Sequence, residues 1–566
     1  MKKWLQYPLL RLTRTEWLLL VLFMTLLIFP LQYISRSLDI STLTSWRWVF
    51  ADKGPASVLL LLLPAVLLAV PLSSSALPEK YPAVFLFLLS VLSCLPFINS
   101  PEYLLDSARY FLQAKYLEMY GISAFFQEWG KEVTAWTDLP LVPLIYGILF
   151  KLFGETKLVV TFFNMLLFGF IPIITYLIGR LLWDRTTGFL AGVLIMASPY
   201  LPTQVPLMLV DIHVMFFLLL AVCTFLYALE QNGFLYTLGA AIAITLALLC
   251  KFSTWPMLGV LGIIILVRID TQPGIIIKRS LTVAVLAGFL LGIIFIWKGV
   301  LILEQINFLR TYQLSGLKNW QEGYVAIFFF QAHPYIFLAA LFGCCRAATN
   351  RDRNIFIIIW FAALVFFLEL KRLRYLLPLL PFLSLTAAYG LQAITIAQVR
   401  RYIIYCGVLS SLVVGISIYR PFLAGTSMSN LKNAGSFLNT LKADAVEVYC
   451  LPQVHSLGNT SVAVPILDLY TDKEIYQNQT WNSEEGYRKA QNASLRFTWE
   501  LRQPNYYRDN KYADLQLPVV VVSSEPISYM PEQLTKKYPS SRVIKKFTNS
   551  SRVFRYQTFV TVFDTI

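Results

Sequence analysis

Residues 158–179, LVVTFFNMLLFGFIPIITYLIG, contain no charged side chain. A helix rises about 1.5 Å per residue, so about 20 apolar residues can cross the roughly 30 Å hydrocarbon core of a membrane. About thirteen apolar runs of this kind follow one another between residues 17 and 419. The pattern predicts an α-helical polytopic membrane protein.

The composition of the chain supports a membrane environment. Of the 566 residues, 57% are hydrophobic and only 14% are charged, with a mean hydropathy of +0.61. Soluble domains carry about 25% charged residues, so a soluble enzyme, a disordered scaffold and a disulfide-framed secreted domain are excluded. The formal charge of +15 could indicate nucleic-acid binding. However, the basic residues lie mostly between apolar runs, which favours membrane topology and anionic lipids and predicts no nucleic-acid partner.

The distribution of basic residues predicts the orientation. Lys2, Lys3, Arg11 and Arg14 precede the first run, which has no small-residue cleavage site and is expected to be a retained signal anchor. Short basic loops stay on the cytoplasmic side, which places the N-terminus there. These loops contain Arg180, Arg185, Arg268, Lys278, Arg279, Arg346, Arg351, Arg353, Arg400 and Arg401. An odd number of crossings then makes the tail extracytoplasmic, in a plasma or inner membrane.

Residues 1–420 are expected to form the transmembrane domain, interrupted by an outer loop at residues 99–157. Two stretches of this loop, Tyr103–Tyr120 and Leu139–Phe153, repeat apolar residues at helical spacing. Helices with one apolar face lie in the membrane interface. The loop is therefore predicted to contain two interfacial helices.

The tail, residues 421–566, is more polar and is expected to form a small extracytoplasmic α/β domain. A helical pattern covers residues 430–442. Runs rich in β-branched and aromatic residues predict strands at Val446–Cys450, Val519–Ser523 and Phe554–Phe563.

Three aspartates of the outer side are candidates for chemistry, because ionisable groups in or beside a membrane are costly to keep. Asp106 and Asp138 begin the two interfacial helices, and Asp211 opens a later apolar run. Each could simply cap a helix, since a carboxylate is stabilised at a helix N-terminus. Asp106 could alternatively act as a general base at the mouth of a cavity open to lipid.

Cations cluster at residues 371–381, KRLRYLLPLLP. They lie on the outer side, against the positive-inside trend, and two prolines follow. They could anchor to anionic headgroups or bind a phosphate, whose charge and shape suit guanidinium and ammonium groups. Lys371 and Arg374 are expected on one helix face, with Arg372 pointing away. Lys251, at the outer end of another run, could extend to the interface or join this site.

These motifs together resemble the GT-C membrane glycosyltransferases, in the branch of the protein O-mannosyltransferases and the lipid A aminoarabinose transferases. The resemblance covers roughly residues 83–395. It depends on the order and sidedness of Asp106-Ser-Ala-Arg-Tyr, Asp138-Leu-Pro-Leu-Val-Pro, Asp211, Leu-Cys-Lys251 and Lys371-x-x-Arg374-Tyr375-Leu-Leu-Pro-x-x-Pro. The tail resembles the extracytoplasmic domain of some members only loosely.

The resemblance implies inverting transfer of a sugar from a polyprenyl-phosphate donor to an acceptor hydroxyl of a protein, lipid or envelope glycan on the extracytoplasmic face. It implies Asp106 as the catalytic base. Contacts to the lipid phosphate would come from Lys371, Arg374, Tyr375 and Arg109, and further contacts to donor or acceptor from Asp138, Asp211 and Lys251.

Two departures from the family pattern bear on this assignment. Many members have a second acid directly after the catalytic aspartate, whereas this chain has Ser107. Many members also have His or Lys before two prolines in the second helix, where this chain has Asp138-Leu139-Pro140. The first departure argues against a metal held by adjacent acids, so neither metal nor cofactor is expected. The second leaves the phosphate contacts to Lys371 and Arg374.

Two other protein classes remain as alternatives. A transporter or lipid flippase would show helix-internal charges and interrupted helices in two repeated halves, and no such halves are visible in the sequence. A structural membrane protein that displays the tail would leave the ordered motifs unexplained.

Overall fold

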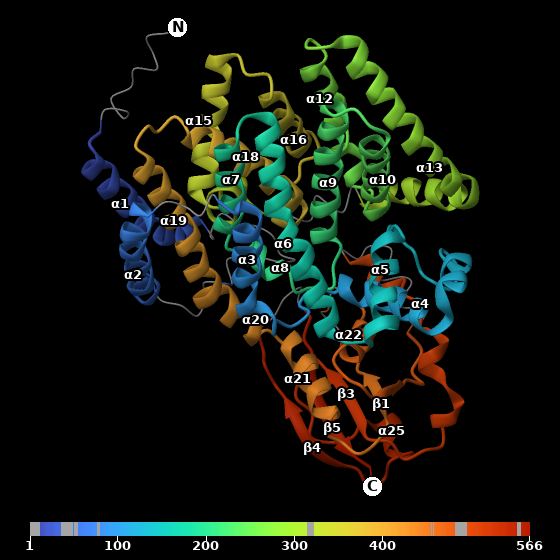
Figure 1. The fold of residues 1–566 in the computed structure, drawn as a ribbon. Helices are drawn as coiled ribbons and strands as arrows, with labels where there is room; N and C mark the ends of the chain where they lie inside the picture. The colour runs from blue at the N-terminus through green and yellow to red at the C-terminus, as the bar shows by residue number, and fades with distance from the viewer. Residues whose placement is uncertain are drawn as a thin grey trace.

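The computed structural model describes residues 12–35, 49, 55–75, 80–313, 322–453, 456, 458–481, 495–551 and 556–565. Lys2, Lys3 and Arg11, on which the expected orientation partly depends, lie outside these residues. Figure 1 shows a large helical bundle above a small sheet. The outer-loop helices α4 (Asp106–Glu128) and α5 (Leu141–Phe153) lie between the two.

The helical bundle contains helices of very different lengths. They are α1 (Arg14–Ser35), α2 (Pro55–Ser74), α3 (Pro82–Cys94), α6 (Lys157–Leu182), α7 (Arg185–Leu194), α8 (Leu201–Gln204), α9 (Asp211–Glu230), α10 (Phe234–Cys250), α11 (Thr254–Met257), α12 (Val260–Arg268), α13 (Pro273–Phe308), α15 (Pro334–Asn350), α16 (Ile355–Phe367), α17 (Leu373–Leu376), α18 (Leu380–Leu391), α19 (Ala397–Val414) and α20 (Arg420–Gly425). Within the described residues, six helical segments are long and apolar enough to cross a membrane. The count of about thirteen crossings therefore stays a prediction.

Prolines explain why several expected apolar runs are shorter helices. Pro96 lies in a 3₁₀ turn that ends the α3 run, and Pro378 lies in another, η8 (Leu377–Leu379), between α17 and α18. Proline lacks the N–H group that would continue an α-helix. The apolar pattern is thus continuous in sequence where the helix is not.

Apolar side chains cover the outside of the bundle as well as its interior. Along α13, Leu281, Val285, Phe289 and Ile296 are exposed, the last to 90%. Exposed apolar rows of this length are stable in lipid and not in water. The outer surface of the bundle is therefore suited to a bilayer.

Close helix packing inside the bundle depends on small residues. Gly343 of α15 and Gly390 of α18 face each other so closely that a Cβ atom on either would meet backbone atoms of the other helix. Such contacts let backbones approach and gain van der Waals energy, which is the main attraction between helices in lipid. The α15–α18 pair forms one rigid wall of the bundle.

Helices with similar bounds occur at both stretches predicted for the outer loop, while their location in the membrane interface stays a prediction. α4 begins at Asp106, and its backbone turns at Gly121, where φ is +84°. α5 ends at Gly154, where φ is +87°. Left-handed φ values favour glycine, so both breaks are set by the local sequence.

The tail forms a five-stranded sheet with strand order β2-β1-β3-β5-β4. The strands are β1 (Ala445–Cys450), β2 (Glu474–Tyr476), β3 (Val519–Ser523), β4 (Arg542–Phe547) and β5 (Phe559–Asp564). The first three in this order are parallel, while β5 pairs antiparallel with β3 and β4. The helices of the tail are α21 (Met428–Leu438), α22 (Ala463–Asp468), α24 (Arg496–Trp499) and α25 (Glu532–Thr535).

The strands β1, β3 and β5 were predicted from the sequence, whereas the two edge strands were not. β5 begins at Phe559, and the predicted start at Phe554 lies outside the described residues. Every residue of β3 is buried, as its run of four valines suggests. β4 has the sequence RVIKKF and is largely exposed. Edge strands are often short or charged, which prevents aggregation and also hides them from pattern analysis.

Charged side chains join the tail to the outer loop. Lys115 Nζ of α4 lies 2.7 Å from Asp468 Oδ2 of α22 and 3.0 Å from Glu155 Oε1. The Tyr507 hydroxyl donates to the same Asp468 oxygen at 2.6 Å. One lysine is thus shared by the buried Asp468 and the half-buried Glu155. Burial and the nearby Asp468 charge raise the pKa of Glu155 to about 8, although Lys115 opposes the rise.

We expect this contact to make the stability of the protein depend on pH. The pKa of Glu155 is raised from 4.5 to about 8, so the folded state binds more protons between these values. Stability is then fully present below about pH 4.5 and falls as the pH rises towards 8. The melting temperature in detergent should drop between pH 6 and pH 9, and Glu155→Gln should reduce this drop.

The exposed Glu532 of α25 provides the matched control. Glu532→Gln should melt with the pH dependence of the unmodified protein. The role of Glu155 would be contradicted if both glutamine variants showed the same dependence.

Candidate active site

Asp106 occupies the first position of α4, but it does not cap the helix. The N-cap residue is Leu105, with no side-chain capping bond. Instead, Asp106 Oδ2 accepts a hydrogen bond from Arg374 Nη1 at 2.7 Å, and Asp106 Oδ1 lies 3.6 Å from Arg109 Nη2. The helix-capping explanation for Asp106 is therefore wrong. The carboxylate is held between two guanidinium groups.

Arg374 joins Asp106 to a second aspartate. Its Nε atom donates to Asp211 Oδ2 at 2.6 Å, while Nη1 bonds Asp106. The side chain is only 3% exposed. A planar guanidinium has donors pointing in several fixed directions, so it can bridge two carboxylates. The single arginine links α4 and α9 across the site.

Asp211 is the first residue of α9, and Val210 is the N-cap, again without a side-chain capping bond. Its second oxygen, Oδ1, accepts from Lys251 Nζ at 3.1 Å. Lys251 follows the end of α10 and has an extended backbone, which turns its side chain back to α9. The ammonium of Lys251 also lies 5.3 Å from the centre of the Tyr375 ring.

Asp138 lies on the other side of Asp106 and pairs with Arg109 through Oδ2 and Nε. Gln113 Nε2 donates to the same Asp138 oxygen at 3.1 Å and to the Thr134 carbonyl at 2.8 Å. Because the cap of α5 is Pro140, capping does not explain Asp138 either. Arg109 follows Asp106 by three residues, and Gln113 follows Arg109 by four. The three side chains therefore share one face of α4.

The six side chains form a line of alternating charge. It runs from Lys251 through Asp211, Arg374, Asp106 and Arg109 to Asp138. Asp106 is 23% exposed, against 5% for Asp211 and 6% for Asp138. It is thus the carboxylate of this line that a substrate can reach most easily.

The surroundings of Asp106 and Asp138 shift the pKa values of the two carboxyl groups in opposite directions. Burial alone would raise the pKa of Asp106, but Arg374, Arg109 and Arg372 hold it well below its usual value. Burial raises the pKa of Asp138, and Arg109 and Gln113 oppose this only in part. Asp106 is therefore ionised at neutral pH and able to accept a proton.

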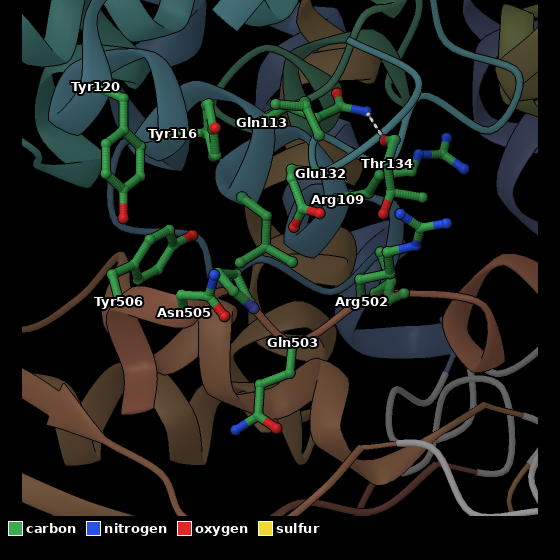
Figure 2. Close-up of a pocket in the computed structure, with 14 residues that line it drawn as sticks. Arg109, Gln113, Tyr116, Tyr120, Glu132, Thr134, Arg502, Gln503, Asn505 and Tyr506 are labelled. Carbon is green, nitrogen blue, oxygen red and sulfur yellow. Dashed lines mark hydrogen bonds between the residues drawn. The ribbon is translucent and has the colours of Figure 1, made fainter. Parts of the chain in front are cut away.

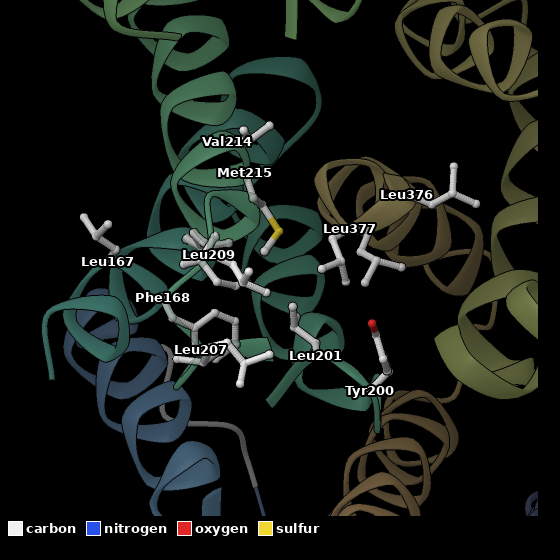
Figure 3. Packing of buried hydrophobic residues seen from close by; sticks show 14 of the residues in the cluster. Leu167, Phe168, Tyr200, Leu201, Leu207, Leu209, Val214, Met215, Leu376 and Leu377 are labelled. Atoms are coloured by element: carbon white, nitrogen blue, oxygen red, sulfur yellow. The ribbon is translucent and has the colours of Figure 1, made fainter. Parts of the chain in front are cut away.

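A buried hydrophobic cluster positions Asp211 and Arg374. Leu376 and Leu377, just after Arg374, pack in the same core as Leu209 and Met215, which flank Asp211 (Figure 3). The ion pair thus forms between segments that apolar packing already holds in place.

Two residues that the sequence analysis did not select support this arrangement. Glu102, just before α4, pairs with Lys157 at the start of α6, and its Oε1 also accepts from the Met208 backbone at 2.8 Å. Lys157 in turn bonds the Pro206 carbonyl. This buried pair connects the outer loop to the segment before Asp211. The sequence signal that could have identified this pair is Lys157, an isolated charge directly before the uncharged residues 158–179.

The expectation that Lys371 and Arg374 share a helix face is wrong. α17 begins only at Leu373, and Arg372 before it has an extended backbone. The segment is held by Glu322, which accepts from the Leu373 N–H at 3.0 Å and donates its own N–H to the Lys371 carbonyl. Arg374 consequently turns towards the aspartates. The Lys371 ammonium lies 5.9 Å from the Tyr324 ring.

Arg372 lies close to the site, although helical spacing predicts that it points away. Its guanidinium carbon lies 5.2 Å from the centre of the Tyr375 ring, and Nη1 donates to the Tyr375 hydroxyl at 3.3 Å. Tyr375 therefore has Arg372 and Lys251 as cationic neighbours. These two cations and the candidate base belong to one continuous group of side chains.

A protein-family model supports the sequence resemblance. Residues 138–297 match the model described as dolichyl-phosphate-mannose-protein mannosyltransferase. The match includes Asp138, Asp211 and Lys251 and excludes Asp106 and the segment at Lys371. Among curated proteins, a sequence search finds no match.

Solved structures show the fold. The chain resembles ArnT from Cupriavidus metallidurans bound to undecaprenyl phosphate, with a TM-score of 0.55 and 13% identity over 85% of this chain and 97% of that one. For the apo state of the same protein, the TM-score is 0.50 at 15% identity, with the same shares covered. The Archaeoglobus fulgidus oligosaccharyltransferase also matches, with a TM-score of 0.47 and 11% identity over 79% of this chain and 70% of that one.

The family model and the two ArnT structures agree with the resemblance seen in the sequence. The chain is an integral membrane protein with the fold of the GT-C glycosyltransferases.

Proposed function

We propose that this protein is an inverting glycosyltransferase that moves a sugar from a polyprenyl-phosphate donor to an acceptor hydroxyl on the extracytoplasmic face. The observation that carries the proposal is the Asp106 carboxylate. It is ionised and partly exposed, and it belongs to a buried network of charges that also includes Lys251 and Arg374. The ArnT structure with undecaprenyl phosphate supports the class of donor.

Asp106 acts as the general base of the proposed reaction. It takes the proton of the acceptor hydroxyl while the hydroxyl oxygen attacks the anomeric carbon of the donor sugar. The bond from that carbon to the phosphate oxygen breaks, and its electron pair leaves with the lipid phosphate. Attack from the face opposite the leaving group inverts the configuration.

The phosphate leaving group gains charge in this step, and fixed cations stabilise it. We assign this role to Lys251 and Arg372, which lie beside the Tyr375 ring, and to Lys371, the residue before Arg372. Arg374 already bonds two carboxylates, so it serves to position Asp106 and Asp211. Arg109 has the corresponding role between Asp106 and Asp138. The reaction needs no metal ion or organic cofactor, because the side chains supply both the base and the positive charge.

Donor binding also raises the basicity of Asp106 in this scheme. Arg372 is one of the charges that lower the pKa of Asp106. A phosphate bound beside Arg372 compensates that charge, so the pKa of Asp106 rises when the donor is in place. The base thus becomes more effective in the donor complex than in the free enzyme.

Comparison of envelope glycoconjugates tests the proposed activity directly. Mass spectrometry of cells with and without the gene should show one sugar modification that disappears with the gene. The gene should restore the modification, whereas a gene carrying Asp106→Asn should not. An identical set of glycoconjugates with and without the gene would contradict the proposal.

The proposed orientation predicts a pattern of cysteine labelling. In the extracytoplasmic orientation, Lys131→Cys in the outer loop and Tyr529→Cys in the tail should react with a membrane-impermeant thiol reagent in intact cells. Both positions are exposed, Tyr529 to 87%. These variants are made with Cys344 and Cys345 changed to alanine.

The exposed Cys345 of the unmodified protein serves as a separate control. It lies near the end of α15, beside a loop expected on the cytoplasmic side. It should react only after permeabilisation. The orientation is wrong if Cys345 reacts in intact cells or if either engineered cysteine requires permeabilisation.

A further inference from the structure

A cavity of about 210 Å³ lies between α4 and the tail segment 501–506. Figure 2 shows the rings of Tyr116, Tyr120 and Tyr506 on one side of it, and the guanidinium groups of Arg109 and Arg502 on the other. The backbone of the loop at Thr134 closes the cavity near Gln113. The transmembrane part and the tail thus build its walls together.

Aromatic rings beside planar polar groups are suited to a sugar. The C–H faces of a pyranose pack on aromatic rings, and its hydroxyl groups both donate and accept hydrogen bonds. Tyr116 and Tyr120 lie side by side, with 4.6 Å between their ring centres. Together with Tyr506 they offer an aromatic wall that faces the polar one.

Four buried polar atoms of the lining residues have no hydrogen-bond partner within the described part of the chain. One is Arg109 Nε, which forms the ion pair with Asp138, and the others are Arg109 Nη1, Gln113 Oε1 and the Tyr506 hydroxyl. Gln113 is only 2% exposed. Buried polar groups without partners are costly and are normally paired in a functional state. Of the last three atoms, two come from α4 and one from the tail, and all three belong to residues that line the cavity.

The charge of the cavity argues against an anionic ligand. Arg109 is already paired with Asp138, and Arg502 Nη1 donates to the Lys131 carbonyl at 2.6 Å. Glu132 also lines the cavity and adds a negative charge. A phosphate would meet little net positive charge here, whereas a neutral polyhydroxy group needs none.

The Arg109 side chain lies between the cavity and the proposed base, Asp106. Arg109 lines the cavity and at the same time lies 3.6 Å from Asp106. Gln113 lines the cavity and bonds Asp138. A ligand that bonds Arg109 and Gln113 from the cavity therefore adjoins the place where the acceptor hydroxyl must lie.

We propose that this cavity binds a sugar residue of the acceptor. This inference rests on the proposed function and specifies its substrate class. The acceptor is a glycan or glycolipid, and its hydroxyl reaches Asp106 while a neighbouring sugar occupies the cavity. The volume is below the roughly 300–1,000 Å³ of sites that enclose drug-sized ligands, so one ring fits and a long chain does not.

Saturation-transfer NMR on the full-length protein in nanodiscs tests the cavity without requiring the natural acceptor. The probes are methyl pyranosides of glucose, galactose, mannose and N-acetylglucosamine, with inorganic phosphate and a serine-threonine peptide for comparison. At least one pyranoside should receive saturation. Tyr116→Ala and Tyr506→Ala should each reduce this transfer at least about threefold, because each removes an aromatic contact.

Matched variants separate binding from folding and from transfer. Tyr506→Phe keeps the ring and should reduce the signal less than Tyr506→Ala, and Tyr529→Ala, at an exposed position of the tail, should leave it unchanged. Asp106→Asn should bind the pyranoside normally. The inference is overturned if no pyranoside receives saturation, or if both cavity variants bind as well as Tyr529→Ala. Absence of sugar transfer with intact pyranoside binding would count against the proposed function alone.

Discussion

Asp106→Asn is expected to lower the rate of sugar transfer by about 10²–10⁴-fold, the usual contribution of a general base. Asparagine has the size of aspartate and can still accept the hydrogen bond from Arg374, but it cannot take a proton from the acceptor. The loss should therefore appear in kcat with little change in the donor KM. The measurement is transfer from a polyprenyl-phosphate sugar by purified protein in nanodiscs.

The exposed Asp472 provides a matched control, because its side chain is 67% exposed and far from the site in the tail. Asp472→Asn should transfer at the rate of the unmodified protein. Equal melting temperatures for both variants would show that the Asp106 variant is folded. Transfer by Asp106→Asn within about tenfold of the unmodified rate would remove Asp106 from the role of base.

Substitution of Arg374 is expected to have the second largest effect, on stability as well as on activity. Arg374→Ala leaves Asp106 and the buried Asp211 without their shared partner. Removal of one partner from a buried ion pair typically costs about 3–5 kcal/mol. The melting temperature should fall clearly, and transfer should be lost.

Arg374→Lys should retain more stability than Arg374→Ala but should still transfer poorly. Lysine keeps the charge, but one ammonium cannot reproduce the separate bonds from Nε to Asp211 and from Nη1 to Asp106. Thermal unfolding and single-turnover transfer measure the two effects independently. A lysine variant with unmodified kinetics would show that the guanidinium geometry is not used.

Two further variants distinguish positioning from phosphate binding. Arg374→Met combined with Asp211→Asn removes both buried charges, so it should recover part of the stability but none of the activity. Arg372→Ala should instead raise the donor KM, and it should lower the melting temperature less than Arg374→Ala, which leaves two carboxylates without their shared partner. Equal effects of Arg372→Ala and Arg374→Ala on stability and donor KM would favour simple anchoring to anionic headgroups.

Local patterns in the sequence were sufficient for the membrane fold and for most of the candidate side chains. Apolar runs predict membrane helices because each run must satisfy its backbone hydrogen bonds within itself. Asp106 and Asp211 were found because both begin helices next to apolar segments, where charge is unusual. The strand β3 was found because it contains four consecutive valines, and β1 was found because its run is rich in β-branched and aromatic residues.

Other features could not be predicted, because the local sequence does not encode them. The edge strand β4 has the composition of a charged surface, and the prolines near η8 divide one apolar run into several helices. Lys371 and Arg374 have helical spacing, yet Glu322 holds the first part of their segment extended. Contact with a distant residue overrides the local spacing.

The sequence by itself determined the membrane class, the family resemblance and the residues with unusual charge for their location. Only the tertiary structure decided which of those charges pair. Arg374 bonds Asp106, which is 268 positions away, rather than a phosphate together with Lys371. Such pairs depend on how the helices pack, and no local periodicity records that arrangement. The cavity beside Arg109 has the same origin, because its walls come from two parts of the chain that meet only after folding.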